Sequence, residues 1–171
     1  MRISTSDKNY ANALIQIEEA EANIKIIEEI LSKSPDLSDI LVNPSISQDI
    51  KYSIITEIFS KDVSAKIVEF LKILVNKKRF GEFNTIAAAF YKKLDEINDI
   101  KRVEVVSAVD LNNDTRKRIT ERLQTKLQKT IIPQWSINEE IIAGLVIKIE
   151  DDIIDASLKN KIESLGKGIS K

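Results

Sequence analysis

The chain has 171 residues and a net charge of −1, with 43% apolar and 31% charged residues, a composition typical of a soluble globular protein. It contains no cysteine and no histidine, which excludes disulfides, thiolate or histidine-rich metal sites and a Ser-His-Asp triad. Its four glycines form no phosphate-binding loop. The composition therefore predicts no cofactor and no metal, and it leaves only an enzyme based on Asp, Glu or Lys open. No apolar run approaches the roughly 20 residues of a membrane-spanning helix, and the first residues lack a signal-peptide core.

The first hundred residues have the apolar spacing of helices. One apolar stripe recurs at intervals of three and four residues over about six turns, which predicts a single helix that ends before Pro35. Ser6 or Asp7 is its expected N-cap. The stripe consists of Tyr10, Ala13, Leu14, Ile17, Ala20, Ile24, Ile27 and Leu31.

Four more helices are predicted before residue 100. A short one covers 36–42, and Asn43-Pro44-Ser45 breaks the chain after it. The next is capped by Ser45 or Ser47 and ends at Phe59, the third begins at Ser64, and a longer one covers about 82–98 after the polar turn 76–81. The side chains expected to point inward are Ile50, Ile54, Ile55 and Ile58, then Ile67, Val68, Leu71, Leu74 and Val75, and finally Phe83, Ile86, Ala87, Phe90 and Leu94.

The period changes after residue 100. The Val-rich segment 102–110 predicts a strand, residues 112–114 cap a helix over 115–129, and the segments 131–137, 141–149 and 153–154 predict further strands. A terminal helix is expected over 157–165. The predicted fold is therefore mainly α, with a helical bundle over residues 1–100 followed by a small α/β domain over residues 101–171.

The helix predicted over 115–129 is strongly basic. Arg118, Arg122 and Lys126 lie four residues apart and so form one stripe on its surface. Such a stripe suits a phosphate backbone or an acidic partner, but it is also the pattern of an ordinary solvated face, which we favour. No aromatic residues interleave with these charges, as single-stranded nucleic-acid binding usually requires.

Other features also have two interpretations. The acids at 150–152 lack EF-hand spacing and predict a turn, with Asp155 or Ser157 capping the terminal helix.

Trp135 could be a binding anchor, but we favour a core residue. The basic tract 77–79 could bind an acidic partner, but we favour a solvated turn. Small residues beside larger ones would let a partner helix approach one face closely, although packing within the bundle is favoured there. That face is formed by Tyr10, Ala11, Ala13 and Leu14.

Three motifs, in order along the chain, resemble the delta subunit family of F-type ATP synthases, whose mitochondrial relative is the oligomycin-sensitivity-conferring protein. Tyr10-Ala-Asn-Ala-Leu14 resembles the YAxAL opening of the first helix, and Asn76-Lys-Lys-Arg79-Phe80 resembles the N-x-x-R-hydrophobic turn. The segment from Ala143 to Leu158 resembles the signature G-G-x-x-[IV]-[RK]…D…[IV]-D-G-S-[VL]. The resemblance extends over nearly the whole chain, and its departures concern loop geometry. They are Asn138, Ala143, Glu150 and Ala156.

The resemblance implies a non-catalytic peripheral-stalk (stator) subunit with no small-molecule substrate. In the family, a six-helix N-terminal domain binds the N-terminal helix of an alpha subunit on the catalytic head. The C-terminal domain binds the C-terminal end of the b subunits of the membrane sector. The subunit thereby resists rotor torque during proton-driven ATP synthesis. The resemblance also implies a peripheral protein at the cytoplasmic face of the bacterial inner membrane.

Residues are carried over to this chain by position. Binding of the alpha helix is expected at Tyr10, Ala11, Ala13, Leu14, Asn76 and Arg79, and at Phe83, Ala87 and Phe90 on a fifth helix. Candidates for binding the b subunits are Arg118, Arg122, Lys126, Ile153, Leu158 and Ile162. An architectural role is expected for Gly144, Asp151, Asp155 and Ser157. Leu14→Asp is expected to abolish alpha binding and to leave the fold intact.

Two alternatives to this function remain from the residues themselves. One is a nucleic-acid-binding adaptor that uses the basic helix 115–129, and the other is an Asp/Glu enzyme. Salt dependence separates the first from a stator subunit, because phosphate contacts weaken steeply with added salt and an apolar helix groove does not.

Overall fold

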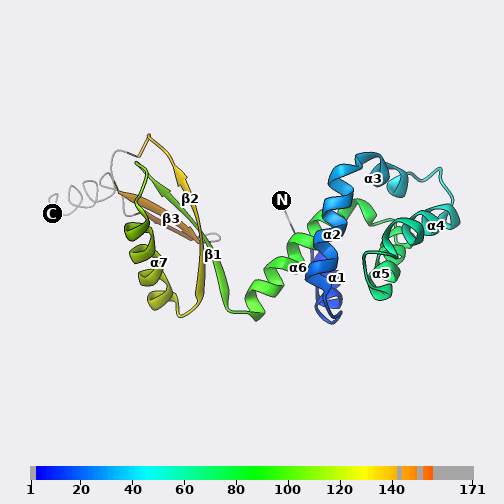
Figure 1. The fold of residues 1–171 in the computed structure, drawn as a ribbon, viewed down its shortest axis with the longest axis horizontal. Helices are drawn as coiled ribbons and strands as arrows, with labels where there is room; N and C mark the ends of the chain where they lie inside the picture. Colours follow the sequence, from blue (N-terminus) through cyan, green and yellow to red (C-terminus); the bar gives the residue numbers. More distant parts are fainter. Residues whose placement is uncertain (1–2, 142–143, 150–151, 156–171) are drawn as a thin grey trace, which may run out of the picture. The chain divides into compact units, whose positions relative to one another are not determined.

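The computed structural model describes residues 3–141, 144–149 and 152–155. The chain divides into two compact units between Leu94 and Asp95. Figure 1 shows helices alone as far as α6, and strands together with helix α7 after it. The sequence-based prediction of a mainly helical protein with a smaller sheet-containing part is confirmed.

The helical unit is built from consecutive α-helices joined by short turns. Pro35 stands at the first position of α3, where a missing N–H costs nothing, so the predicted end of the preceding helix is confirmed. The elements are α1 (Thr5–Ile15), α2 (Ala20–Lys33), α3 (Pro35–Val42), α4 (Gln48–Phe59), α5 (Ala65–Asn76), the 3-10 helix η1 (Phe80–Glu82) and α6 (Phe83–Ile97).

The long helix predicted at the start of the chain is wrong, because the chain breaks between α1 and α2. Glu19 has a φ of 59°, in the left-handed region that a continuous helix does not allow. The Asn23 side chain holds this turn, since its Nδ2 donates to the Glu19 carbonyl at 2.6 Å and its Oδ1 accepts from the Ser64 N–H at 2.8 Å. A contact with a residue so far along the chain is invisible to local apolar spacing.

Helix α4 buries a different face from the predicted one. Ile50 is 54% and Ile58 37% exposed, so the prediction is wrong for both, whereas Ile55 and Phe59 are fully buried. The buried stripe is displaced by one residue, about 100° around the helix. This orientation buries the large ring of Phe59, which removes more apolar surface from water than another isoleucine would.

The other helices follow the predicted pattern. All five positions expected to point inward on α5 are buried, and on α6 the same holds except for Leu94, which packs half-buried against the core. Tyr91 on α6 donates its hydroxyl to Glu28 Oε2 on α2 at 2.8 Å. Burial, together with this carboxylate, raises the pKa of Tyr91 well above its usual value, so the hydroxyl remains a donor.

The second unit is a four-stranded sheet with one crossover helix. The strand order is β2-β1-β3-β4, in which β1 and β2 are parallel and the other pairs are antiparallel. Parallel neighbours need a crossover connection, which α7 supplies. The elements are β1 (Ile100–Ser107), α7 (Asn113–Leu127), β2 (Thr130–Ile137), β3 (Leu145–Ile149) and β4 (Asp152–Asp155).

The core of this unit lies between α7 and the sheet, where Figure 1 shows the helix along the strands. Val105 pairs with Trp135 on one side and Ile147 on the other, so these three side chains share a face of the sheet. Leu123 of α7 packs into the same cluster, and Trp135 lies half-buried against it. Asn112 caps α7 by accepting from the Thr115 N–H at 2.9 Å, as predicted.

We expect Glu19→Gly to stabilise the protein by about 0.5 kcal/mol. Glycine removes the strain of about 1–2 kcal/mol that a left-handed backbone imposes on glutamate. The greater conformational freedom of glycine in the unfolded chain offsets part of this gain in stability. Ala22→Gly, three residues later on an exposed position inside α2, should instead destabilise by about 1 kcal/mol. Urea unfolding of both variants measures the difference. A loss of stability in Glu19→Gly would show that the turn is not under strain.

Candidate functional site

Helix α1 is fixed at its start by a capping box. Ser4 Oγ accepts from the Asp7 N–H at 3.2 Å, and Asp7 Oδ2 accepts from the Ser4 N–H at 2.8 Å. The cap is therefore Ser4, and the prediction of Ser6 or Asp7 as N-cap is wrong because the acid acts as the reciprocal partner three residues on.

An apolar surface lies where α1 meets α5. The rings of Tyr10 and Phe70 pack edge to face with centroids 6.1 Å apart, and Tyr10 is half-buried. Ala13, one turn along α1, is exposed, and Ile73, one turn along α5 from Phe70, is 49% exposed. We call the accessible residues Tyr10, Ala13 and Ile73 the α1–α5 seam; Phe70, which is only 6% exposed, belongs to the core beneath it. It combines a small residue with larger apolar ones, which suits the approach of another helix.

Two of the residues expected on this face are inside the protein. Ala11 and Leu14 are each only 1% exposed and belong to the core. The expectation that Leu14→Asp would leave the fold intact is therefore wrong. The sequence analysis did not single out Ile73. The one feature of the sequence that could have indicated its exposure is that this apolar residue lies outside the buried stripe of α5.

The turn after α5 places Asn76 and Arg79. Asn76 is the exposed last residue of α5, and the left-handed Lys78 (φ 57°) reverses the chain so that the Arg79 N–H donates to the Leu74 carbonyl at 2.8 Å. The Arg79 guanidinium pairs with Glu82. Arg79 thus helps to shape the turn that leads into α6 through its backbone N–H and its guanidinium.

The residues expected on a fifth helix lie on α6, the sixth, because the predicted first helix is divided in two. Phe83, Ala87 and Phe90 are at most 2% exposed and form part of the core. Their side chains leave almost no surface accessible to a partner in this structure. They pack in the core of the helical unit instead.

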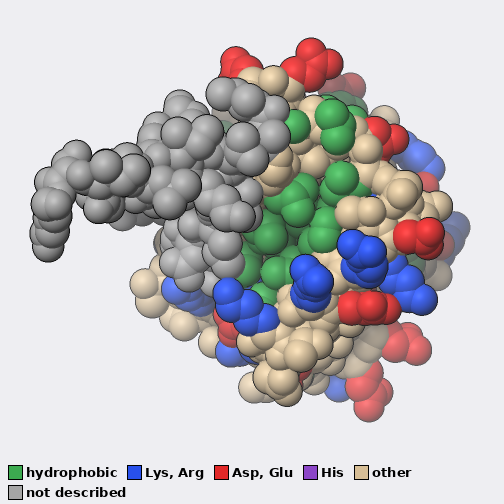
Figure 2. Space-filling model, turned by 90° about the vertical axis from the view of Figure 1, so that its left-hand side faces the viewer, with side chains coloured by type: hydrophobic (Ala, Val, Ile, Leu, Met, Phe, Trp, Pro, Cys, Tyr) green, Lys and Arg blue, Asp and Glu red, His purple; other side chains and the backbone are tan. Residues whose placement is uncertain are grey.

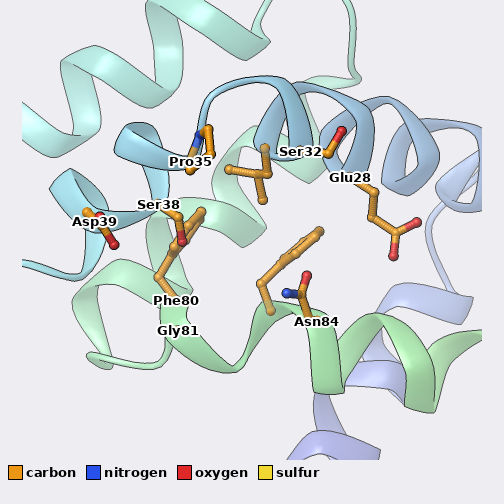
Figure 3. A pocket seen from close by; sticks show the side chains of 10 residues that line it. Glu28, Ser32, Pro35, Ser38, Asp39, Phe80, Gly81 and Asn84 are labelled. Atoms are coloured by element: carbon orange, nitrogen blue, oxygen red, sulfur yellow. The ribbon is translucent and has the colours of Figure 1, made fainter.

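A pocket of about 420 Å³ opens beside the turn, between α2, α3 and the start of α6. Figure 3 shows Ser38 above Phe80 from the turn, with Glu28 of α2 and Asp39 of α3 at opposite ends of the pocket. Of the residues expected to bind alpha, only Phe83 lines it. The pocket is therefore distinct from the α1–α5 seam.

The basic stripe of α7 is exposed. Arg118, Arg122 and Lys126 share one surface of this helix with Glu121 and Thr125. In the described part of the chain none of these three cations forms an ion pair. Figure 2 shows Lys and Arg side chains gathered beside a group of hydrophobic ones on one face.

Arg116 lies off that stripe. Its guanidinium stands 5.4 Å from the ring centroid of Trp135 and donates to Asp110 Oδ1 at 2.7 Å. It therefore closes the end of the sheet core, and Trp135 packs there as the sequence favours.

The structure describes only some residues of the C-terminal family signature, which covers 143–158. Gly144 has a φ of 105°, a value that favours glycine, directly before β3. Ile153 and Asp155 are in β4, opposite Lys148 and Val146 of β3. Outside the described residues lie Asp151, Ser157, Leu158, Ile162 and the expected terminal helix.

Comparison with known proteins identifies the family. Residues 7–169 match the family described as ATP synthase delta (OSCP) subunit. The chain is 34% identical to the ATP synthase subunit delta of Chlorobaculum parvum, over 96% of this chain and 95% of the relative. The corresponding protein of Prochlorococcus marinus is 33% identical over 95% and 94% of the two chains. The chain belongs to the ATP synthase delta (OSCP) subunit family.

A solved structure shares the fold of this delta-family chain. It is a chain of the Toxoplasma gondii mitochondrial ATP synthase hexamer, with a TM-score of 0.63 at 17% identity over 98% of this chain and 99% of that chain. Delta subunits are non-catalytic parts of the peripheral stalk, so the enzyme alternative is wrong and nothing supports the nucleic-acid adaptor. Among the described residues, no helix has the length and apolar character needed to cross a membrane.

We expect Leu14→Asp to destabilise the delta-family chain by about 3 kcal/mol or more, because it places a carboxylate in the apolar core. Ala13→Asp, the same change at the neighbouring exposed position, should cost only about 1 kcal/mol through lower helix propensity near the end of α1. Thermal unfolding followed by circular dichroism compares them. Equal losses would show that Leu14 is not in the core.

Proposed function

We propose that the helical unit binds the N-terminal helix of an alpha subunit at the α1–α5 seam. The observation that carries this proposal is the exposed Ile73 beside the Tyr10–Phe70 contact, in a chain of the delta family. An amphipathic helix laid along the seam would cover Ile73 and meet the small Ala13, where its backbone can approach closely. Burial of such apolar surface stabilises a complex by about 25 cal/mol per Å² before the cost of association.

The remaining expected alpha-binding residues act indirectly in this proposal. Ala11 and Leu14 hold α1 against the core, and Phe83, Ala87 and Phe90 do the same from α6. Asn76 is exposed at the end of α5 and extends the seam, whereas Arg79 fixes the turn through Glu82. The six helices α1–α6 then form one binding bundle.

The sheet unit binds the C-terminal end of the b subunits in this proposal. The three exposed cations of α7 support an acidic helix as the partner, because each lacks an internal counter-charge among the described residues. Ile153 is in the edge strand β4. Leu158 and Ile162 stay candidates from the sequence.

The chain thereby joins the catalytic head to the stator and resists rotor torque during proton-driven ATP synthesis, at the cytoplasmic face of the bacterial inner membrane. Such a role needs two adhesive surfaces and no reaction centre. The α1–α5 seam and the α7 stripe are surfaces of this kind, one apolar and one cationic.

We expect Ile73→Asp to weaken binding of a synthetic alpha N-terminal helix at least tenfold, since it places a charge in an apolar interface. The matched control is Ile50→Asp, because Ile50 is also about half exposed but lies on α4. Isothermal titration calorimetry measures both affinities. If Ile73→Asp binds as tightly as Ile50→Asp, the seam is not the alpha site.

We expect Arg122→Glu to weaken binding of a fragment that holds the C-terminal end of a b subunit. The loss should be about fivefold to tenfold at low salt, and less at high salt, because exposed charges are screened. Lys117→Glu is the control, an exposed cation of the same helix outside the stripe. Surface plasmon resonance at two salt concentrations reports the effect. Equal losses in the two variants would assign the effect to net charge and not to the stripe.

A further inference from the structure

Asn23 on α2 is a buried polar side chain that joins two segments far apart in the sequence. It is only 5% exposed. Its Nδ2 donates to the Glu19 carbonyl at 2.6 Å, and its Oδ1 accepts from the Ser64 N–H at 2.8 Å. Both ends of the buried amide therefore have a partner. In coiled coils a single buried Asn fixes the register of two helices, and directional hydrogen bonds can fix the spacing of helices in the same way.

The two bonds of Asn23 end next to the two helices that form the α1–α5 seam. Glu19 belongs to the turn between α1 and α2, and Ser64 is the residue directly before α5. The Ser64 hydroxyl does not cap α5, since it is buried and has no hydrogen-bond partner among the described residues. Its backbone N–H is instead held by Asn23. One side chain thus ties the chain at the end of α1 to the start of α5.

A second contact between these helices is less restrictive. The rings of Tyr10 and Phe70 pack edge to face with centroids 6.1 Å apart. Apolar packing has no fixed direction, so the rings can shift along each other, whereas an N–H···O bond weakens steeply when its angle changes. Of the two contacts, the Asn23 bridge therefore restricts the relative position of α1 and α5 more narrowly.

We propose that Asn23 is a positioning residue for binding of the alpha helix, an inference that rests on the function proposed for the seam. By tying α1 to the start of α5, it sets the distance between Ala13 on one helix and Ile73 on the other. A partner helix needs both residues at once, because its backbone approaches Ala13 while its side chains cover Ile73. Without the bridge the apolar core still holds the bundle together, but only a fraction of the molecules have the spacing that fits the partner.

The first experiment compares Asn23→Ala with the control Leu41→Ala. Leu41 is 1% exposed on α3, which contributes no residue to the seam, so its truncation destabilises the bundle without breaking the bridge. Circular dichroism identifies a temperature at which both variants are folded. Isothermal titration calorimetry at that temperature should show that Asn23→Ala binds the synthetic alpha N-terminal helix about fivefold more weakly or worse, and that Leu41→Ala binds like the wild type. Equal affinities for the two variants would overturn the proposal.

The second experiment removes the same bond from its other end. Ser64 has a φ of −65°, the value that proline imposes, so Ser64→Pro deletes the N–H without straining the φ of this residue. Because both changes break one bond, the double variant should bind the alpha helix no more weakly than Asn23→Ala alone. Additive losses would mean that the two residues act separately, which contradicts the proposal. If Asn23→Ala does not fold, Ser64→Pro replaces it in the comparison with Leu41→Ala.

A distance measurement separates a failure of this inference from a failure of the alpha site. The chain has no cysteine, so Asn12→Cys on α1 and Glu69→Cys on α5, both exposed and outside the seam, can carry the two spin labels. Double electron–electron resonance should show a broader or shifted distance distribution when Asn23→Ala is added, and no change in the control. An unchanged distribution disproves the positioning role. A broader distribution, with Ile73→Asp binding as tightly as Ile50→Asp, would mean that Asn23 positions the helices but that the seam is not the alpha site.

Discussion

An apolar side chain packed in the core cannot at the same time contact a partner, and this constraint decides which residues of the chain are able to bind. Leu14, Phe83, Ala87 and Phe90 hold the helices together, each with at most 2% of its surface exposed. Ile73 lies on α5, a neighbouring helix of the same bundle, and is half exposed. The motif Tyr10–Leu14 contains both kinds of residue, since Leu14 is buried and Ala13 is exposed. Only burial separates the residues that contact a partner from those that hold the contacting helix in place.

The two units would bind by different physics. The α1–α5 seam is apolar, so its affinity should depend on buried area and little on salt. The stripe of Arg118, Arg122 and Lys126 is cationic and exposed, so it should mainly influence association rate and partner choice. A stator subunit with one surface of each kind distinguishes its two partners by chemistry, because an apolar helix gains little from the stripe and an acidic one gains little from the seam.

Much of the fold could be predicted from the sequence because helix stripes and strand runs are local signals. The stripe of α5, the cap Asn112 and the change of period near residue 100 are all read from neighbouring residues. The break at Glu19 could not be predicted from the sequence, because it is fixed by a hydrogen bond between Asn23 and the distant Ser64. On α4 the isoleucines at 50, 54, 55 and 58 offer two overlapping stripes, and only the packed core selects the one that contains Phe59. The same rotation buries Lys51, which no local pattern indicates.

Helix α6 belongs to both units, which bears on how the proposed joint would carry load. Its first turns pack Phe83 and Phe90 in the helical core, while Asp95 in its last turn accepts two hydrogen bonds from the Arg102 guanidinium on β1, at 2.6 and 3.1 Å. Asp99 in the short connection is also tied to the sheet, through its carbonyl to the Thr130 N–H at 2.9 Å and its carboxylate to Lys129 at 3.3 Å. In the joint that we propose, any tension between the two units would pass along the chain through the last turn of α6 and the short connection into β1. A helix under axial tension loads its i→i−4 hydrogen bonds in each turn, so its resistance comes from the core contacts that keep those turns from opening. The bidentate Arg102–Asp95 pair lies directly after Leu94, the last α6 residue packed against the helical core, so it holds the end of α6 where that core support stops.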